Sequence, residues 1–289
     1  MEACGLCHSD LFVCGLPRLP VSPLRLGHEG IGRVEALGPD ITGWAPGDRA
    51  GITFLGPTCG SCEWCASGRE RFCPKQTNFG YSIQGAMGEV VAVPAKALVR
   101  VPGSLAPETT APLCCAGWTA FGALREARLQ PGQTVAIFGF GGLGHLALQI
   151  ALHQGLQVAV IDTAVRKVEA ARAAGATADA RGVDAAIVFT AAPQAIPEAF
   201  RALRRNGRLV LVGLSTSNYE LPLVDTVLKG IEVRGSYLGT RSDLDAVFHL
   251  ASQGVLHPEI HTHRIEETPA LLEQMQRGEL SGRAVIRFC

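Results

Sequence analysis

One stretch near the middle of the chain constrains the fold more than any other: QTVAIFGFGGLGHLALQIALHQGLQVAVID, residues 133–162. It contains an apolar run of strand length, a glycine-rich turn, a stretch with apolar residues at helical spacing and a second apolar run. Two strands joined by a helix form a βαβ unit, whose strands lie parallel in one sheet. The stretch therefore predicts an α/β domain built on a parallel sheet.

The same alternation of strands and helices continues to residue 241. The runs DAAIVFTAA, RLVLVGL and IEVRGSYLG are expected strands, and VEAARAAGA and PEAFRALRRNG are expected helices. Strands that are apolar along their whole length are typical of a parallel sheet covered on both faces. We therefore expect a doubly wound sheet over residues 117–241.

The rest of the chain has a different composition and a different pattern of apolar residues. Residues 1–116 are rich in Gly, Pro and short Val/Ile runs such as EVVAVPAKALVRVP, which indicate short strands joined by turns. Residues 242–289 contain a helical segment, DLDAVFHLASQG, and end in the strand-like RAVIRFC. A mostly β domain is therefore expected beside the α/β domain.

The glycine-rich turn indicates a dinucleotide site. Gly139, Gly141 and Gly144 form a G-x-G-x-x-G pattern between the first strand and the helix, and Gly142 and Leu143 complete the turn. Glycines at these positions let the backbone approach a pyrophosphate, which then rests on the helix N-terminus.

Asp162 ends the second strand, at the separation expected for a carboxylate that accepts hydrogen bonds from ribose hydroxyls. Its charge repels a 2′-phosphate, so NAD is favoured over NADP. Arg166 and Lys167 follow closely, either as solvated helix charges or as cations that weaken this preference. Lys167 is therefore also a candidate cofactor-binding residue.

The strongest local motif is C-x2-C-x2-C-x7-C, formed by Cys59, Cys62, Cys65 and Cys73. One loop with this spacing is able to wrap a tetrahedral zinc ion, and four thiolates leave no open position on the metal. The spacing differs from those of ferredoxin iron–sulfur clusters. A structural zinc is therefore predicted, with four unliganded thiols as the alternative.

Composition narrows the partners. Lys and Arg total 26 and so do Asp and Glu, which argues against nucleic acid or an anionic membrane and favours a small neutral substrate. No apolar run is long enough to span a bilayer and no signal peptide is evident, so a cytoplasmic protein is expected. Ten cysteines in a reducing compartment are expected to be metal ligands or nucleophiles rather than disulfides.

Three further segments, CGLCHSD, GHEG and PLCCAGWTAF, supply cysteine and histidine. Each segment alone has an ordinary structural explanation, since an isolated histidine is usually structural and an isolated cysteine is usually a small buried hydrophobic residue. An open catalytic zinc needs three protein ligands and one exchangeable position. Together the segments offer two thiolates and one imidazole for such a site.

With these segments, the four-cysteine lobe and GFGGLG in this order, the chain resembles the zinc-dependent medium-chain alcohol dehydrogenases, especially the yeast and bacterial primary-alcohol branch. The resemblance covers essentially the whole chain. It implies a GroES-like catalytic domain over residues 1–116 with the zinc lobe at 59–73, a Rossmann NAD-binding domain over 117–241, and a return to the catalytic domain over 242–289. It also implies two zinc ions per chain, an alcohol, aldehyde or ketone substrate, and a dimer or tetramer.

The resemblance also assigns roles to residues. Cys7, His28 and Cys115 are the implied ligands of the catalytic zinc, Glu29 is an alternating fourth ligand, and Asp10 is the carboxylate that orients an imidazole. Ser9 is implied to hydrogen-bond the substrate oxygen. The implied cofactor contacts are His8, Val212, Ser236, Leu238 and Arg241, and the residues near implied substrate-pocket positions are Leu16, Leu19, Phe54 and Trp118. These apolar pocket residues favour a hydrophobic alcohol, although core packing explains the same composition.

Two departures from the family pattern stand out. Phe12 occupies the position of a histidine that ends the proton relay in many relatives, so activity is expected to rise more steeply with pH than in those relatives. The family's strands upstream of Cys-His-Ser-Asp are missing, which suggests either a wrongly assigned start or a truncated enzyme.

The leading hypothesis is an NAD-linked, zinc-dependent alcohol dehydrogenase. The first alternative is an NADPH-linked aldehyde reductase of the cinnamyl-alcohol type, against which Asp162 argues. The second is a truncated, non-catalytic relative that binds zinc and nucleotide.

Overall fold

The computed structural model describes residues 1–288, which form two compact units. The first combines Met1–Ala116 with the chain from Thr240 onward, and the second is Gly117–Gly239. No helix among the described residues is long and apolar enough to cross a membrane.

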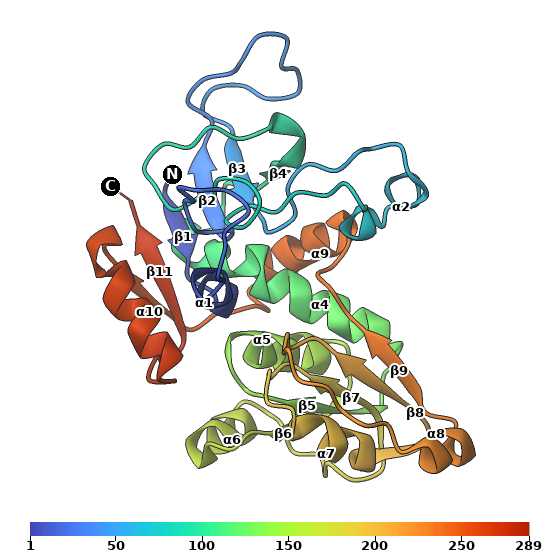
Figure 1. Ribbon diagram of the computed structural model, residues 1–289. Coiled ribbons are helices and arrows are strands. Elements are labelled where there is room, and N and C mark those ends of the chain that lie inside the picture. The colour runs from blue at the N-terminus through green and yellow to red at the C-terminus, as the bar shows by residue number, and fades with distance from the viewer. Residues whose placement is uncertain (289) are drawn as a thin grey trace. The chain divides into compact units, whose positions relative to one another are not determined.

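The first unit is built on a six-stranded mixed sheet with the order β10-β11-β1-β2-β3-β4 (Figure 1). Its strands are β1 (Ala3–Gly5), β2 (Gly30–Arg33), β3 (Arg49–Ile52), β4 (Val99–Arg100), β10 (Ile260–His263) and β11 (Arg283–Arg287). Neighbours are antiparallel except β10 and β11. The short strand β1 pairs with both β11 and β2, so the two ends of the chain meet in one sheet.

Short helices occupy the connections of the first unit. They are α1 (His8–Cys14), α2 (Glu63–Ala66), α3 (Pro107–Thr110), α9 (Arg241–Ser252) and α10 (Thr268–Gln276), with the 3-10 turns η1 (Glu70–Phe72), η2 (Ala95–Ala97), η3 (Ala111–Cys114) and η4 (Ile265–Glu267). The expected strand content of EVVAVPAKALVRVP is mostly wrong. Only Val99 and Arg100 are in a strand, because Val90 faces solvent and Pro94 lacks a backbone donor for a ladder.

The second unit is a five-stranded parallel sheet with the order β6-β5-β7-β8-β9. Its elements are α4 (Ala116–Ala127), β5 (Thr134–Phe138), α5 (Gly142–His153), β6 (Gln157–Ile161), α6 (Val165–Ala173), β7 (Val183–Val188), α7 (Ala195–Ala202), β8 (Leu203–Leu211), α8 (Leu223–Lys229) and β9 (Glu232–Gly235). The predicted parallel α/β sheet is confirmed. The helix expected over 197–207 ends earlier, because Leu203 pairs with Val183 and starts β8.

The sheet of the second unit differs from a complete dinucleotide-binding sheet, in which six strands have the order 3-2-1-4-5-6. The strands β6-β5-β7-β8-β9 match 2-1-4-5-6, and no third strand is present among residues 1–288. After α6 the chain returns directly to β7, so β6 is an edge strand. Its outer side is contacted by Ala178, whose N–H donates to the Val158 carbonyl at 3.1 Å.

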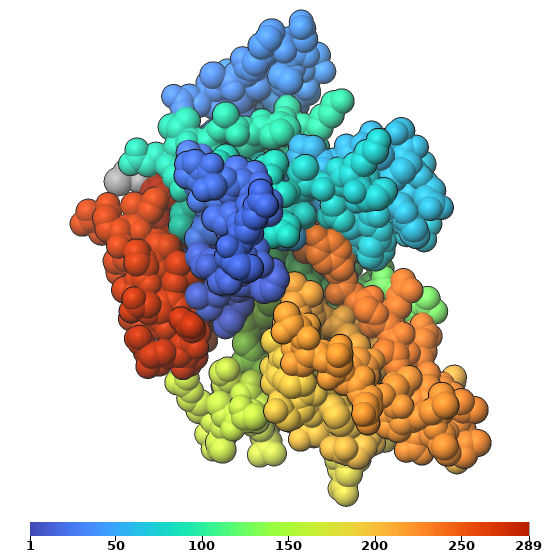
Figure 2. Space-filling view, in the orientation of Figure 1, coloured from blue at the N-terminus to red at the C-terminus, as the bar shows by residue number. Residues whose placement is uncertain are grey.

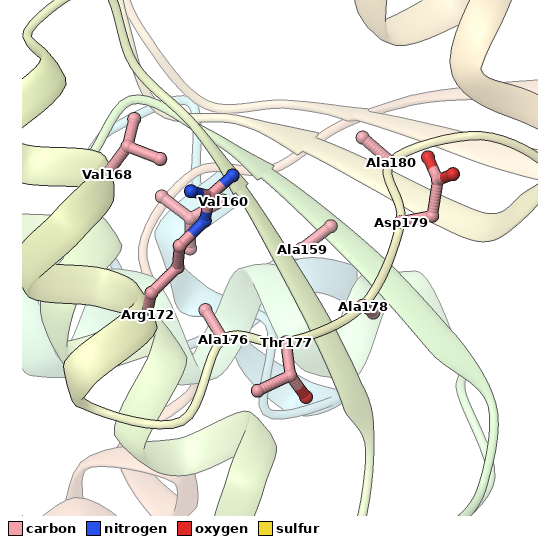
Figure 3. Close-up of a pocket in the computed structure, with 9 residues that line it drawn as sticks. All are labelled: Ala159, Val160, Val168, Arg172, Ala176, Thr177, Ala178, Asp179 and Ala180. Carbon is pink, nitrogen blue, oxygen red and sulfur yellow. The ribbon is translucent and has the colours of Figure 1, made fainter.

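A cavity of about 370 Å³ lies against this edge (Figure 3). Small side chains from the α6–β7 connection do not fill the space beside β6. The lining residues are Ala159, Val160, Val168, Arg172, Ala176, Thr177, Ala178, Asp179 and Ala180. None of them belongs to the site residues predicted from the sequence.

Candidate active site

Four side chains from three distant segments of the first unit meet in its interior. One ligand atom from each of Cys7, His28, Glu29 and Cys115 lies within 4.8 Å of the others, and all four residues are buried. Cys7 precedes α1, the His-Glu pair precedes β2, and Cys115 follows η3. The pairing of β1 with β2 brings the first two segments together.

The histidine of this cluster is oriented for a metal. Its Nδ1 lies 3.5 Å from the Asp10 carboxylate, whereas its buried Nε2 has no hydrogen-bond partner among residues 1–288. Asp10 is itself held by the backbone N–H groups of Cys7, at 2.8 Å, and Gly27, at 3.3 Å. An imidazole held at one nitrogen by a carboxylate, with the other nitrogen beside two thiols, fits a zinc ion.

The electrostatics of the cluster also suit a cation. A hydrogen bond from Cys115 lowers the pKa of the Cys7 thiol, and the neighbouring His28 lowers it further. Burial opposes protonation of His28, but the Asp10 carboxylate outweighs this effect, so its pKa is raised. The cluster therefore favours a thiolate beside a cation even before a metal is considered.

Arg283 is a component of this site that the sequence reasoning missed. Its Nη2 donates to Oε1 of Glu29, and the two side chains are 5% and 0% exposed. Burial raises the pKa of Glu29 to about 7, against the lowering effect of Arg283. A Cβ at Gly5 would lie 1.9 Å from Glu29 Oε2, so only glycine fits beside this carboxylate. Arg283 lies 254 residues from its partner, and no local motif marks it.

The second cysteine cluster lies in a single loop of the first unit. Ligand atoms of Cys59, Cys62, Cys65 and Cys73 are within 4.8 Å of one another, and the Sγ–Sγ distances that join neighbours are 3.6–3.9 Å. The backbone N–H of Cys62 donates to Cys59 Sγ at 3.4 Å. Hydrogen bonds from the backbone at Ser61 and Cys62 lower the pKa of the Cys59 thiol to about 6. These four thiols also fit a zinc ion.

The second unit carries the glycine turn and its carboxylate. Gly139 has a φ of +97°, and a Cβ at Gly144 would lie 2.0 Å from the Gly139 carbonyl oxygen, so the turn requires glycine. Asp162 accepts hydrogen bonds from the backbone N–H of Phe140, at 2.8 Å, and of Ala164, at 3.0 Å. Lys167 Nζ lies 3.8 Å from the same carboxylate. The turn and Asp162 are therefore adjacent, as a dinucleotide requires.

The remaining predicted residues are placed as follows. The Ser9 hydroxyl lies 3.7 Å from Cys7 Sγ, and the Phe54 ring packs edge-on against His28 with centroids 5.1 Å apart. His8 is exposed at the start of α1. The other predicted residues are distributed over the two units. Leu16 and Leu19 are half-buried beyond α1, Val212, Ser236 and Leu238 follow β8 and β9, Trp118 is buried in α4, and Arg241 pairs with Glu70 in the first unit.

Known proteins match both units. Residues 1–103 match the alcohol dehydrogenase GroES-like domain, and residues 177–253 match the zinc-binding dehydrogenase family. An alcohol dehydrogenase of Geobacillus stearothermophilus is 38% identical over 305 aligned positions, which cover 100% of this chain and 90% of the relative. Since this chain has 289 residues, at least 16 positions of the relative have no counterpart in it.

Solved structures match as well. The alcohol dehydrogenase of Aeropyrum pernix has a TM-score of 0.90 at 29% identity, with 99% of this chain and 90% of that one covered. The acetophenone reductase of Geotrichum candidum, solved in complex with NAD, has a TM-score of 0.88 at 27% identity, with 99% and 88% covered. These neighbours share the two-unit architecture along nearly the whole chain.

Proposed function

Because the chain belongs to the zinc-dependent medium-chain alcohol dehydrogenases, we propose that it transfers a hydride between NAD(H) and a hydrophobic primary or secondary alcohol or its carbonyl product. The observation that supports this proposal is the buried cluster of two thiols and an imidazole whose Nε2 has no hydrogen-bond partner among the described residues. It is an arrangement with room for one further, exchangeable ligand.

In this proposal Cys7, His28 and Cys115 hold the catalytic zinc, and Glu29 is the alternating fourth ligand. Bound there, zinc supplies a Lewis acid that stabilises negative charge on the substrate oxygen. Asp10 fixes the His28 ring so that Nε2 stays directed at the metal. Ser9, beside Cys7, exchanges the proton of the substrate hydroxyl.

NAD is the proposed cofactor because of how Asp162 is held. Two backbone N–H groups fix the carboxylate beside the glycine turn, where it accepts hydrogen bonds from ribose hydroxyls and repels a 2′-phosphate. Lys167 partly offsets this charge at 3.8 Å. We therefore expect Asp162→Gly to lower kcat/KM for NAD by roughly tenfold or more and to raise that for NADP, since the lost hydrogen bonds to a charged group are each worth about 1.5–3 kcal/mol. Steady-state kinetics with both cofactors measure this.

The second zinc is proposed to be structural. Its four thiols come from one loop and leave no ligand position open.

We also infer that the protein is a homo-oligomer that associates through α8. Leu223, Val224, Val227 and Leu228 are each 67–71% exposed, and α8 has no buried residue. The two charged residues of α8, Asp225 and Lys229, form an ion pair with each other at 3.4 Å, so neither charge is left unpaired beside the apolar side chains. Figure 2 shows the segment in orange at the surface of its unit.

We propose that a second copy of the chain covers this face. In an isologous interface, α8 of one copy packs against α8 of the other, and α8 lies next in the chain to β9, the edge strand of its sheet. Light scattering of Val227→Asp tests this. The variant is expected to be a monomer, whereas Val90→Asp, at an equally exposed valine elsewhere, keeps the oligomer.

The activity is tested by measuring zinc per chain together with turnover of ethanol, butanol and benzyl alcohol with both cofactors. Two ions and NAD-dependent oxidation support the proposal. One ion and no turnover support a non-catalytic relative, and a preference for NADPH with cinnamaldehyde supports the aldehyde reductase.

A further inference from the structure

The outer edge of β6 is partly open, because no third strand pairs with it among residues 1–288. The N–H of Gln157 and the carbonyl of Ile161 form hydrogen bonds with residues that flank β5. Since bonding alternates along a parallel strand, Val158 and Val160 direct their main-chain groups to the outer edge. The Val158 carbonyl accepts the Ala178 N–H at 3.1 Å, whereas neither outer group of Val160 has a partner in the described chain. This open edge is too short for a strand to add to it, but it offers one donor and one acceptor to a small molecule.

The cavity of about 370 Å³ beside this edge has a mostly apolar wall. Val168 and Arg172 are four residues apart on α6, so their side chains lie on one face of that helix, and both line the cavity. The 176–180 segment also lines it, with alanine at every second position. All of these residues belong to the second unit. The volume has room for roughly ten non-hydrogen atoms, since a water molecule occupies about 30 Å³.

The uncompensated charge of this cavity is that of Arg172. Its guanidinium forms no hydrogen bond or ion pair with another residue among 1–288, and Figure 3 shows it extending from α6 toward Val160. Asp179, the acidic residue of the lining, is paired instead with Arg181, whose Nη2 lies 3.0 Å from its Oδ2. This hydrogen bond lowers the pKa of the Asp179 carboxyl. The cavity therefore presents one positive charge beside an apolar wall.

We propose that this cavity binds a small monocarboxylate with a short apolar chain, held by the Arg172 guanidinium and the open edge at Val160. A guanidinium binds a carboxylate through two parallel hydrogen bonds. The apolar chain of the ligand packs against Val168 and the alanines, and its removal from water supplies further affinity. A phosphate carries more charge than one arginine balances and gains nothing from the apolar wall. The site goes beyond the proposed hydride transfer and does not depend on it.

The first experiment titrates the zinc-loaded full-length protein with hexanoate, whose size fits the cavity, by isothermal calorimetry. The wild type is expected to bind it with a Kd of about 1 mM or lower. Arg172→Gln should weaken binding roughly tenfold or more, because hydrogen bonds between charged groups are lost. Arg166→Gln is the matched control, since Arg166 is exposed on the same helix but does not line the cavity. No binding by the wild type at tens of millimolar, equal binding by Arg172→Gln, or equal binding of neutral hexanamide overturns the proposal.

The second experiment fills the cavity and separates it from the Cys7 cluster, where a zinc ion would also attract a carboxylate. Val168→Phe should abolish hexanoate binding, whereas Val165→Phe, at an exposed valine of α6 outside the cavity, should not. Circular dichroism checks that both variants fold, and if Val168→Phe does not, Arg172→Gln decides. Cys115→Ser should bind hexanoate as the wild type does, whatever its effect on turnover. Binding that survives in folded Val168→Phe, or that disappears in Cys115→Ser, overturns the cavity site, whereas a loss of turnover alone concerns only the proposed function.

Discussion

The two cysteine clusters of the first unit differ in how they are built. The four-cysteine lobe takes all its ligands from residues 59–73 and is half-exposed, whereas the Cys7 cluster draws on three segments and is buried. In the lobe, backbone N–H groups of the same loop contact the sulfurs. In the buried cluster, Asp10 and Arg283 hold the histidine and the carboxylate from other elements.

This difference fits the two metal roles proposed above. A loop that supplies four thiolates needs only its own folding to close around an ion. A site whose ligands are brought together by strand pairing keeps its geometry when one ligand position on the metal is open, because the surrounding core holds the ligand residues in place. Loss of a ligand should therefore abolish chemistry in the buried cluster and reduce stability in the lobe.

The largest expected effect tests the buried cluster. Cys115→Ser should remove the catalytic zinc and lower kcat/KM by roughly a thousandfold or more, since a Lewis acid contributes several kcal/mol and each 1.36 kcal/mol is tenfold. The fold should persist because the sheet does not depend on this ligand. Zinc analysis should find one ion per chain, with an unchanged circular dichroism spectrum. Retained activity would mean that the chemistry occurs elsewhere.

The next effect tests the ion pair behind the cluster. Arg283→Leu leaves the Glu29 carboxylate buried without its cation, at a cost of about 3–5 kcal/mol. At about 2–4 °C per kcal/mol for a chain of this size, the Tm should fall by roughly 10 °C. Arg283→Lys keeps the charge and should lose clearly less. Scanning calorimetry of the zinc-loaded variants measures both, and equal losses would show that packing rather than charge matters at this position.

A smaller effect on activity is expected in the lobe. Cys73→Ser should release the structural zinc and lower the Tm by several degrees. The three remaining thiols bind zinc more weakly than four and therefore order the loop less. The kcat of the folded fraction should stay within about threefold, which is under 1 kcal/mol. A loss of kcat as large as that of Cys115→Ser would remove the distinction between the clusters.

The same contrast explains what the sequence could and could not predict. The lobe and the glycine turn are local motifs, so spacing alone identified Cys59–Cys73 and Gly139–Gly144 as candidates. Cys7, His28 and Cys115 required the resemblance, because their segments meet only through strand pairing. Arg283 was missed because its partner is 254 residues away. The missing third strand was also overlooked, since an alternation of strands and helices does not reveal the order of strands in the sheet.

The smallest expected effect concerns how protons leave the buried cluster, a problem that the lobe does not have. Phe12 lies on α1, five residues after Cys7, and is 51% exposed, so it borders solvent without being able to carry a proton. Phe12→His should flatten the rise of kcat with pH between about 6 and 8, because histidine titrates in this range. The gain at pH 6 should be a few-fold. Phe12→Asn, which is polar but does not titrate there, is the control. A profile that Phe12→His leaves unchanged would show that the proton leaves by a route that bypasses α1.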